Sequence, residues 1–583
     1  MVICLKLTLS LEWEKLDFNI DPSKITFIER EKIVNALIIA DDFNELTNEE
    51  FSKRISLLVD FSFDLKRIDG LEDAIEKLNS YLKRDLSLFD KSLGHYFLAN
   101  AYSCKKSLNI KVADAILKWH NIDIEKEILN YRLSLKYLQP VSIVETPANK
   151  KSQEDIFQYN IRQCQVFTNL GNLMDSVGRF IEGIENRNNA LSINPKFGMA
   201  LGNKGMSYMW YSRYLYDKGH QAVFLHTAYH LLKSSLKCQL EFGADTAFKK
   251  TISIISQQLS NEYLNKKIDF DSFSLGDTDE EIQYRKWCLQ NCLFLNPLND
   301  IGPYPIAARD VLHIPTITTK INEGPNCQIL YNLLKQEFVT ARYFYYKGVS
   351  GTGTHFSDKD VFLFDTEDNP VYSITSEEIK NSFRICYSIF DKIAFFLNYY
   401  FKLGIVENKV YFKKIWYNEQ KKDKRKLKSS DKKRLTLNPY FTQKNNLPLL
   451  GLFWISKDLF EDDIRFTDSL EPDAKEWYKI RNHLEHKFLK LGLSDDENCN
   501  SSYNLLGEVD KNITYSIEIR DFERKSLKLL KTTRAALIYL VLAMQYEEFE
   551  RNKNRGKDVK LAQISLQKFP DELKTNDYYD PKK

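Results

Sequence analysis

Residues 477–491 read WYKIRNHLEHKFLKL, and their apolar side chains recur every three or four positions. At 100° per residue, such spacing gathers the apolar side chains on one face of a helix. That face consists of Trp477, Ile480, Leu484, Phe488 and Leu491. The stretch therefore predicts an amphipathic helix from about Asp473 to Leu491, with this face in a protein core.

The opposite face of the predicted helix carries the side chains that are suited to chemistry. Asn482 and His486 are four residues apart and lie nearly opposite the apolar face, while Arg481 lies at its edge and is long enough to reach them. On a monomer these groups would form a solvated surface. If a second copy of the helix packs across them, symmetry brings two arginines and two histidines into one cleft.

Three further helices are expected beside this one. They cover residues 333–343, 375–401 and 522–551, each with apolar residues at helical spacing. Four such helices with a shared core make a bundle. Between the first two, residues 361–364 and 371–374 flank a turn signal and predict a small β-hairpin insertion. The expected fold class is all-α.

The N-terminal half shows a weak repeat of the tetratricopeptide (TPR) kind. Its best copy has these residues at template positions: Phe167, Leu170, Gly171, Met174, Ala190 and Pro195. A step of about 34 residues takes Gly171 to Gly205 and Met174 to Tyr208. Arg187 departs from the template, which has an aromatic residue there. The pattern predicts stacked helical hairpins, which either bind a partner in a concave groove or only hold another domain in place.

Five segments are expected along the chain. They are an N-terminal helical region (1–90), degenerate TPR-like repeats (91–295), a proline-containing linker (296–322), the four-helix domain (323–555) and a polar C-terminal tail (556–583).

Composition excludes several classes of protein. The 583 residues include 83 basic and 80 acidic side chains, so the whole molecule is no general polyanion binder. The nine scattered cysteines indicate a reducing compartment rather than a disulfide framework. No secretion signal or apolar stretch of membrane-spanning length is present, so we expect a cytoplasmic protein without membrane contact. No cofactor and no metal site are predicted, because no phosphate-binding or zinc-ligand spacing is found.

One segment is strongly basic. Between residues 421 and 434 nine basic residues face only two aspartates. The basic residues are Lys421, Lys422, Lys424, Arg425, Lys426, Lys428, Lys432, Lys433 and Arg434. Such a run either is a solvated loop or binds RNA phosphates electrostatically, and the sequence leaves both interpretations open.

Two copies of the Arg481, Asn482 and His486 set are suited to metal-independent cleavage of RNA. One imidazole can accept the proton of a ribose 2′-OH while its symmetry mate protonates the leaving 5′-oxygen, because imidazole has a reference pKa of ~6.5. The guanidinium groups of Arg481 would stabilise charge on the phosphorus, and Asn482 would orient the phosphate or the ring. The product would be a 2′,3′-cyclic phosphate, and DNA would not react.

The Arg-Asn-x-x-x-His element at 481–486, on the third helix of a small bundle, resembles the HEPN superfamily. Residues 451–460 and 383–392 are similar to segments of a bacterial subfamily in which TPR-like repeats precede a HEPN domain. The resemblance implies a homodimeric ribonuclease that acts as a toxin or effector in anti-phage defence by abortive infection. It also implies an RNA substrate, a protein or phage-derived trigger on the repeats, and an antitoxin as partners. Arg481, Asn482 and His486 match the motif, which gives His483 no role.

Two alternatives stay open. Arg481 and Glu485 are spaced for an ordinary surface ion pair, and the chain could be a non-catalytic adaptor that binds a protein or nucleotide and regulates another effector. Three further polar residues are candidates for supporting positions around the motif: Glu337, Arg342 and Asp391.

Overall fold

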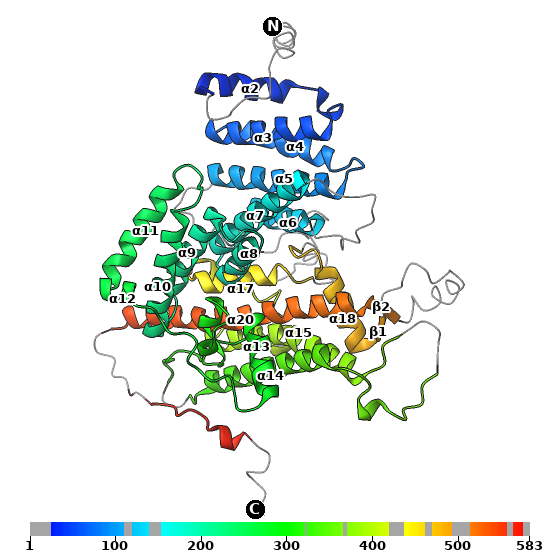
Figure 1. The fold of residues 1–583 in the computed structure, drawn as a ribbon. Coiled ribbons are helices and arrows are strands. Elements are labelled where there is room, and N and C mark those ends of the chain that lie inside the picture. The colour runs from blue at the N-terminus through cyan, green and yellow to red at the C-terminus, as the bar shows by residue number, and fades with distance from the viewer. Residues whose placement is uncertain are drawn as a thin grey trace, which may run out of the picture.

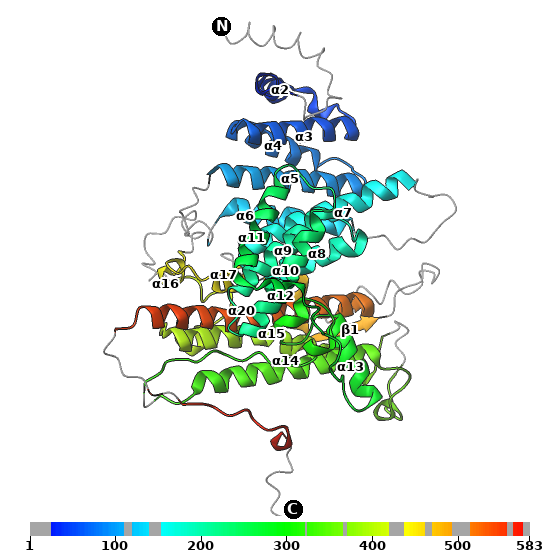
Figure 2. The ribbon, with the colours of Figure 1, turned by 60° about the vertical axis from the view of Figure 1, so that its left-hand side comes forward.

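The structure is a computed structural model that describes residues 25–109, 119, 121–138, 153–320, 323–364, 370–418, 436–460, 469–492, 514–556, 562 and 564–574. Apart from one two-stranded sheet, the regular secondary structure of the described part is helical, which confirms the expected all-α class. In Figures 1 and 2 the chain descends from the N-terminal helices, through a middle layer of helical hairpins, to a C-terminal bundle at the opposite end. None of the described helices is both long enough and apolar enough to cross a membrane.

The N-terminal and middle layers contain twelve of the described helices. They are α2 (Phe27–Ile39), α3 (Asn48–Asp64), α4 (Ile68–Tyr81), α5 (Leu88–Asn109), α6 (Ile122–Tyr137), α7 (Gln153–Ser176), α8 (Phe180–Ile193), α9 (Gly198–Ser212), α10 (Lys218–Ser235), α11 (Ala244–Gln258), α12 (Asn261–Asn265) and α13 (Asp279–Gln290). Helices α2 to α4 and one face of α5 share a separate apolar core. The pairs α5/α6, α7/α8 and α9/α10 pack as consecutive hairpins, an arrangement consistent with TPR-like repeats.

Two glycines 34 positions apart occupy equivalent places in successive hairpins. A Cβ on Gly171 would lie 3.0 Å from the carbonyl oxygen of Gly183, and one on Gly205 would lie 3.1 Å from that of Ala228. Both glycines therefore allow the two helices of a hairpin to approach closely. Arg187, which departs from the repeat template, is buried, and its guanidinium donates to Ser207 Oγ at 2.6 Å and to an Asp175 carboxylate oxygen at 2.7 Å.

The C-terminal layer is the bundle. Its elements are α14 (Asn326–Ser350), α15 (Ile374–Phe401), α16 (Pro439–Thr442), α17 (Leu447–Ser456), α18 (Ala474–His486), β1 (Phe488–Gly492), β2 (Thr514–Glu518) and α20 (Ile519–Lys553). Helices α14, α15 and α20 pack on one another, α17 covers α20, and α18 rests against α15. One continuous core runs from α5 of the middle layer to α20.

The proline-containing segment that follows α13 packs between the middle layer and the bundle. Asp300 is buried and accepts a hydrogen bond from Tyr211 of α9 at 3.1 Å. Arg534 of α20 donates to the same carboxylate at 2.6 Å and to the carbonyl oxygens of Phe294 and Asn296. This segment thus joins the hairpins to the bundle through buried polar contacts.

Two predictions about local structure were wrong. Residues 361–364 form no strand and are exposed, while Pro370 bridges to Gly492 and Val371 N–H donates to Leu491 O at 2.8 Å. The second half of the predicted hairpin thus pairs with the end of β1, and Ile374 already opens α15. The described strands β1 and β2 instead form a parallel pair.

The motif helix is also shorter than predicted. Helix α18 ends at His486, and Phe488 and Leu491 belong to β1 rather than to the helix. Phe488 is exposed and Leu491 is buried. Pairing with β2 satisfies the backbone of this segment, which a fourth helical turn would otherwise have done.

Candidate active site on helix α18

Helix α18 is anchored by its apolar face. Trp477, Ile480 and Leu484 are buried, as the sequence predicts. The guanidinium of Arg384 on α15 donates to the carbonyl oxygen of Leu484, one of the last-turn carbonyls that has no partner within the helix. Lys487 N–H donates to His483 O at 3.2 Å and closes the last turn. The packing of its apolar face and these hydrogen bonds therefore fix the position of α18 and of its outward residues.

The outward side of α18 presents the three residues of the motif. His486 is exposed at the C-terminal end of the helix, and Arg481 and Asn482 are half-buried. Arg481 donates to the side-chain oxygen of Asn482 at 3.1 Å, and its guanidinium lies 5.9 Å from the ring centroid of Tyr387 on α15. The structure thus brings Arg481 and Asn482 into contact and places His486 one helical turn beyond Asn482.

Neither Arg481 nor His486 forms an ion pair in the described part of the chain. In particular, Arg481 bonds to Asn482 rather than to Glu485, which is exposed. The ordinary surface ion pair that the spacing allows is therefore not formed there. A guanidinium whose charge is not compensated by a carboxylate is available to bind an external anion.

The neighbouring histidine has a different environment. His483 contacts the carbonyl oxygen of Lys479 through Nδ1 at 2.7 Å, and its ring lies 5.4 Å from that of Tyr515 on β2. The Tyr515 hydroxyl donates to Glu476 at 2.8 Å, and burial together with this bond raises the pKa of Tyr515. His483 thus belongs to the contact between α18 and the small sheet.

The three predicted supporting residues have partners elsewhere. Glu337 pairs with Lys392 at 2.6 Å, on the outer side of α14 and α15. Arg342 is buried and donates to both carboxylate oxygens of Asp310 at 2.8 Å, and Asp391 accepts from Phe412 N–H at 2.9 Å. None of these contacts reaches the motif residues of α18.

The Arg342 contact has a clear structural role. Burial alone would raise the pKa of Asp310, but the Arg342 guanidinium, the Leu295 N–H and Lys335 together outweigh it and lower that pKa below its ordinary value. Arg342 also donates to Leu293 O at 3.0 Å. It therefore fastens the proline-containing segment to α14.

Sequence reasoning did not single out Arg384 and Tyr387 as site residues. Both lie on α15 and reach α18 through the contacts described above. Their spacing of three residues puts them on one face of α15. This spacing is the sequence feature that could have identified the two residues, but it does so only when α15 is known to face α18.

Two other predictions concern ligands. The basic run 421–434 lies outside the described residues. Within the described part, no group of three His, Cys, Asp or Glu side chains is arranged to hold a metal ion.

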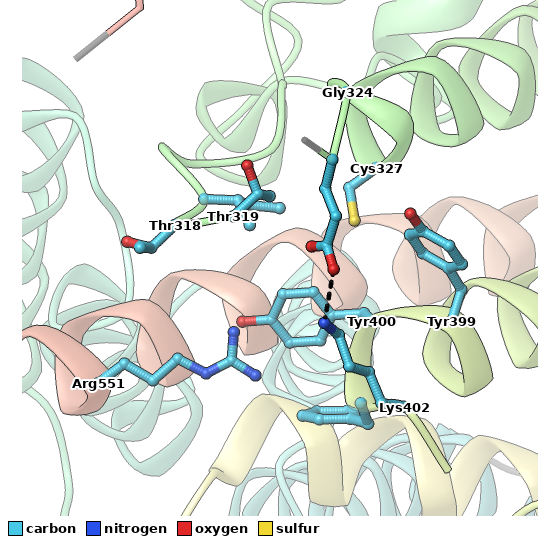
Figure 3. Close-up of a pocket in the computed structure, with 11 residues that line it drawn as sticks. Thr318, Thr319, Gly324, Cys327, Tyr399, Tyr400, Lys402 and Arg551 are labelled. Carbon is cyan, nitrogen blue, oxygen red and sulfur yellow. Dashed lines mark hydrogen bonds and ion pairs between the residues drawn. The ribbon is translucent and has the colours of Figure 1, made fainter. Parts of the chain in front are cut away.

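A small cavity of about 250 Å³ lies near the C-terminal end of α20. Figure 3 shows Arg551 beside Tyr400 in the lining of this cavity. The Arg551 guanidinium lies 4.5 Å from the Tyr400 ring centroid, and Lys402 pairs with Glu323 at 2.9 Å. Lys525 pairs with Glu476 of α18 at 3.1 Å. Along α20, Lys525 lies about 40 Å from Arg551 of the cavity, at about 1.5 Å per residue. This cavity is therefore separate from the motif.

The fold and the outward Arg-Asn-His set define a protein of helical hairpins followed by a bundle that displays a charged motif. Residues 318–547 match the family model described as LA2681-like HEPN, and this segment belongs to the HEPN superfamily. A HEPN domain indicates a nuclease or nucleotide-binding role and is compatible with RNA binding and dimerisation. No curated protein and no solved structure matches the chain.

Proposed function

We propose that this protein is a metal-independent endoribonuclease whose active site forms between two copies of α18. The observation that carries the proposal is the outward set on this helix. Arg481 bonds to Asn482 and meets no carboxylate in the described part, while His486 is exposed at the helix end. These are the groups that a phosphodiester requires: a charged fork, an orienting amide and an accessible imidazole.

The proposed cleavage requires two proton transfers, one from the attacking 2′-hydroxyl and one to the leaving 5′-oxygen. The neutral imidazole of one His486 takes the proton of a ribose 2′-OH, and the 2′-oxygen forms a bond to phosphorus. The bond from phosphorus to the 5′-oxygen breaks, and the protonated His486 of the other copy gives its proton to that oxygen. The products are a 2′,3′-cyclic phosphate and a 5′-hydroxyl. Arg481 stabilises the charge on the phosphorus, and Asn482 orients the phosphate.

This scheme requires a symmetric dimer, because one exposed imidazole cannot act as general base and general acid at the same time. A twofold axis near α18 would supply the second His486 and the second Arg481. The basic segment 421–434 would add phosphate contacts along the RNA. In the cell we propose that the enzyme is a cytoplasmic effector of anti-phage defence, with the repeats receiving a protein or phage-derived trigger and an antitoxin restraining it.

The test is to incubate the purified full chain with total cellular RNA, with and without EDTA, and to map the new ends. We expect cleavage in EDTA, with 2′,3′-cyclic phosphate and 5′-hydroxyl ends. Loss of all cleavage in EDTA would contradict the mechanism.

The matched variants are His486→Ala and His483→Ala on the same helix. General acid–base catalysis contributes roughly 10²–10⁴-fold, so His486→Ala should lose cleavage to that extent and should relieve growth arrest on expression. His483→Ala should retain cleavage, because in the part of the chain that the structure describes this ring contacts Lys479 and Tyr515 rather than the motif residues. Equal cleavage by His486→Ala and the wild type would show that His486 is not the catalytic residue. Absence of cleavage by the wild type itself would favour a non-catalytic adaptor.

A further inference from the structure

A large cavity of about 660 Å³ lies between the helical hairpins and the bundle. One wall comes from α7 and α8, and the other from the N-terminal half of α20. The segment from Glu471 to Asp473, which directly precedes α18, lines the same cavity. Cavities of 300–1,000 Å³ are of the size that holds an organic ligand.

The lining combines apolar and amide side chains. Leu170, Met174 and Leu527 supply apolar surface, while Asn186 and Gln290 offer both donors and acceptors. Such a mixture suits an organic molecule better than a bare inorganic ion.

Accessible basic side chains of α20 line this cavity, and the Glu185 carboxylate of α8, which is 41% exposed, is accessible as well. Arg524, Lys528 and Lys531 follow one another at helical spacing, and their side chains are 47%, 44% and 31% exposed. Lys528 pairs at 2.6 Å with Glu471, whose side chain is only 2% exposed. Lys531 pairs at 2.8 Å with Glu185 of α8.

These charges favour an anion as the ligand. An entering anion reaches half-exposed ammonium and guanidinium groups that can turn toward it. A metal cation would need several converging carboxylates, and the described residues contain no such group of three. A phosphate ester offers several acceptor oxygens for adjacent cations on one helix face.

The cavity is connected to the start of the motif helix. Arg132 of α6 binds both carboxylate oxygens of Asp458, at 2.5 and 3.0 Å, and approaches Glu471 at 3.7 Å. Burial alone would raise the pKa of Asp458, but Arg132 and Arg179 outweigh it and lower that pKa. Glu471 in turn accepts from Asp473 N–H at 3.3 Å, one residue before α18 begins.

We propose that this cavity binds a phosphorylated organic molecule whose phosphate oxygens replace Glu471 on Lys528 and Glu185 on Lys531. Release of Glu471 loosens the start of α18, so that ligand in the cavity controls the helix that carries Arg481 and His486. The regulatory consequence rests on the proposed nuclease function, whereas the binding itself does not.

The binding test uses ATP and inorganic pyrophosphate as probes and the shift in Tm of the full chain as the readout. We expect saturating ATP to raise Tm by about 2–4 °C, and pyrophosphate to raise it less because it leaves the apolar wall empty. The double variant Lys528→Gln/Lys531→Gln should lose the shift, measured against its own Tm without ligand. Lys553→Gln, an exposed basic position on α20 outside the cavity, should keep it.

Two further arms separate this site from the motif. Arg481→Ala should keep the ATP shift, since Arg481 does not line the cavity. Hydrogen exchange of residues 474–486 should become faster with ATP in the wild type and stay unchanged in the double variant. Absence of any shift, a shift that the double variant retains, or one that Arg481→Ala abolishes would overturn the binding site. Unchanged exchange in α18 would overturn the control of that helix.

Discussion

Arginines occur in two contrasting settings in this protein. Arg534 and Arg342 are buried, and each meets a carboxylate, Asp300 at 2.6 Å and Asp310 at 2.8 Å. Arg481 is half-buried, bonds to the neutral side chain of Asn482 and has no carboxylate partner among the described residues. The first two arginines have their charge compensated within the fold, and the third does not.

This difference separates two structural arginines from an arginine that is available for the proposed binding of a phosphate. Burying a charge is costly unless it is paired, so a buried Arg-Asp contact must be completed inside the protein. A partly exposed guanidinium stays hydrated and can exchange water for the oxygens of a phosphate. Local sequence cannot distinguish the settings, because Asp300 and Asp310 lie far from Arg534 and Arg342 along the chain.

The largest expected effect comes from breaking a buried pair. Arg534→Ala leaves the Asp300 carboxylate buried without its partner, and such a change costs about 3–5 kcal/mol. We expect Tm, measured by calorimetry, to fall by several degrees. Cleavage by the folded protein at low temperature should stay near the wild-type rate, because Arg534 lies outside the motif.

A second substitution sharpens this test. Asp300→Asn in the Arg534→Ala background removes the uncompensated charge and should recover part of the lost stability. If Arg534→Ala lowers the free energy of unfolding by less than 1 kcal/mol, or if Asp300→Asn recovers nothing, the buried pair does not join the hairpins to the bundle as described.

The second-largest effect is expected at Arg481, where the cleavage rate rather than the stability should change. Removing one donor that stabilises transition-state charge costs about 10²–10³-fold in rate, so Arg481→Ala should reduce RNA cleavage to that extent. Tm should change by less than 1 °C, since partly exposed positions outside buried networks tolerate substitution. Arg481→Lys should fall between, because an ammonium keeps the charge and loses the fork.

Glu485→Gln is the matched control for Arg481. Because Glu485 does not pair with Arg481 in the structure, its neutralisation should leave cleavage within about twofold of the wild type. Wild-type cleavage by Arg481→Ala, or a large loss in Glu485→Gln, would reverse the contrast between the two kinds of arginine.

A smaller effect is expected from the basic run. Replacing Lys421, Lys422, Lys424 and Arg425 with Gln should weaken RNA binding about tenfold. The slope of log K against log salt should decrease by up to about 3, at 0.7 per phosphate contact on single strands. Lys249→Gln/Lys250→Gln, on exposed positions of α11, should leave the slope unchanged. The same slope in both variants would make the run a solvated loop.

Sequence periodicity predicted the long helices and the buried face of α18, because both depend on local spacing. It predicted the C-terminal end of α18 wrongly, because Phe488 and Leu491 fit the apolar spacing of a helix as well as a strand. The deciding interaction is the parallel pairing of β1 with residues 514–518, more than twenty positions further on. The sequence of one strand does not indicate which distant residues will pair with it.

The contacts of the proposed supporting residues could not be predicted for a related physical reason. Arg342 looked like a free polar residue on a helix, yet it bonds to Asp310, 32 positions earlier. The outward position of His486 could be predicted because it depends only on the helix phase. Tyr387 could not, since its contact with Arg481 requires the packing of α15 against α18.

The smallest expected effect is at that tyrosine. The Arg481 guanidinium lies 5.9 Å from the ring centroid of Tyr387, and a cation–π contact at a partly exposed site contributes about 0.5–1 kcal/mol. Tyr387→Leu should therefore lower kcat/KM for RNA about two- to fivefold, by letting Arg481 leave its orientation toward Asn482. Tyr387→Phe keeps the ring and should cleave at the wild-type rate. If the leucine variant cleaves as well as the phenylalanine variant, the ring does not orient Arg481, and the hydrogen bond to Asn482 alone holds the guanidinium in place.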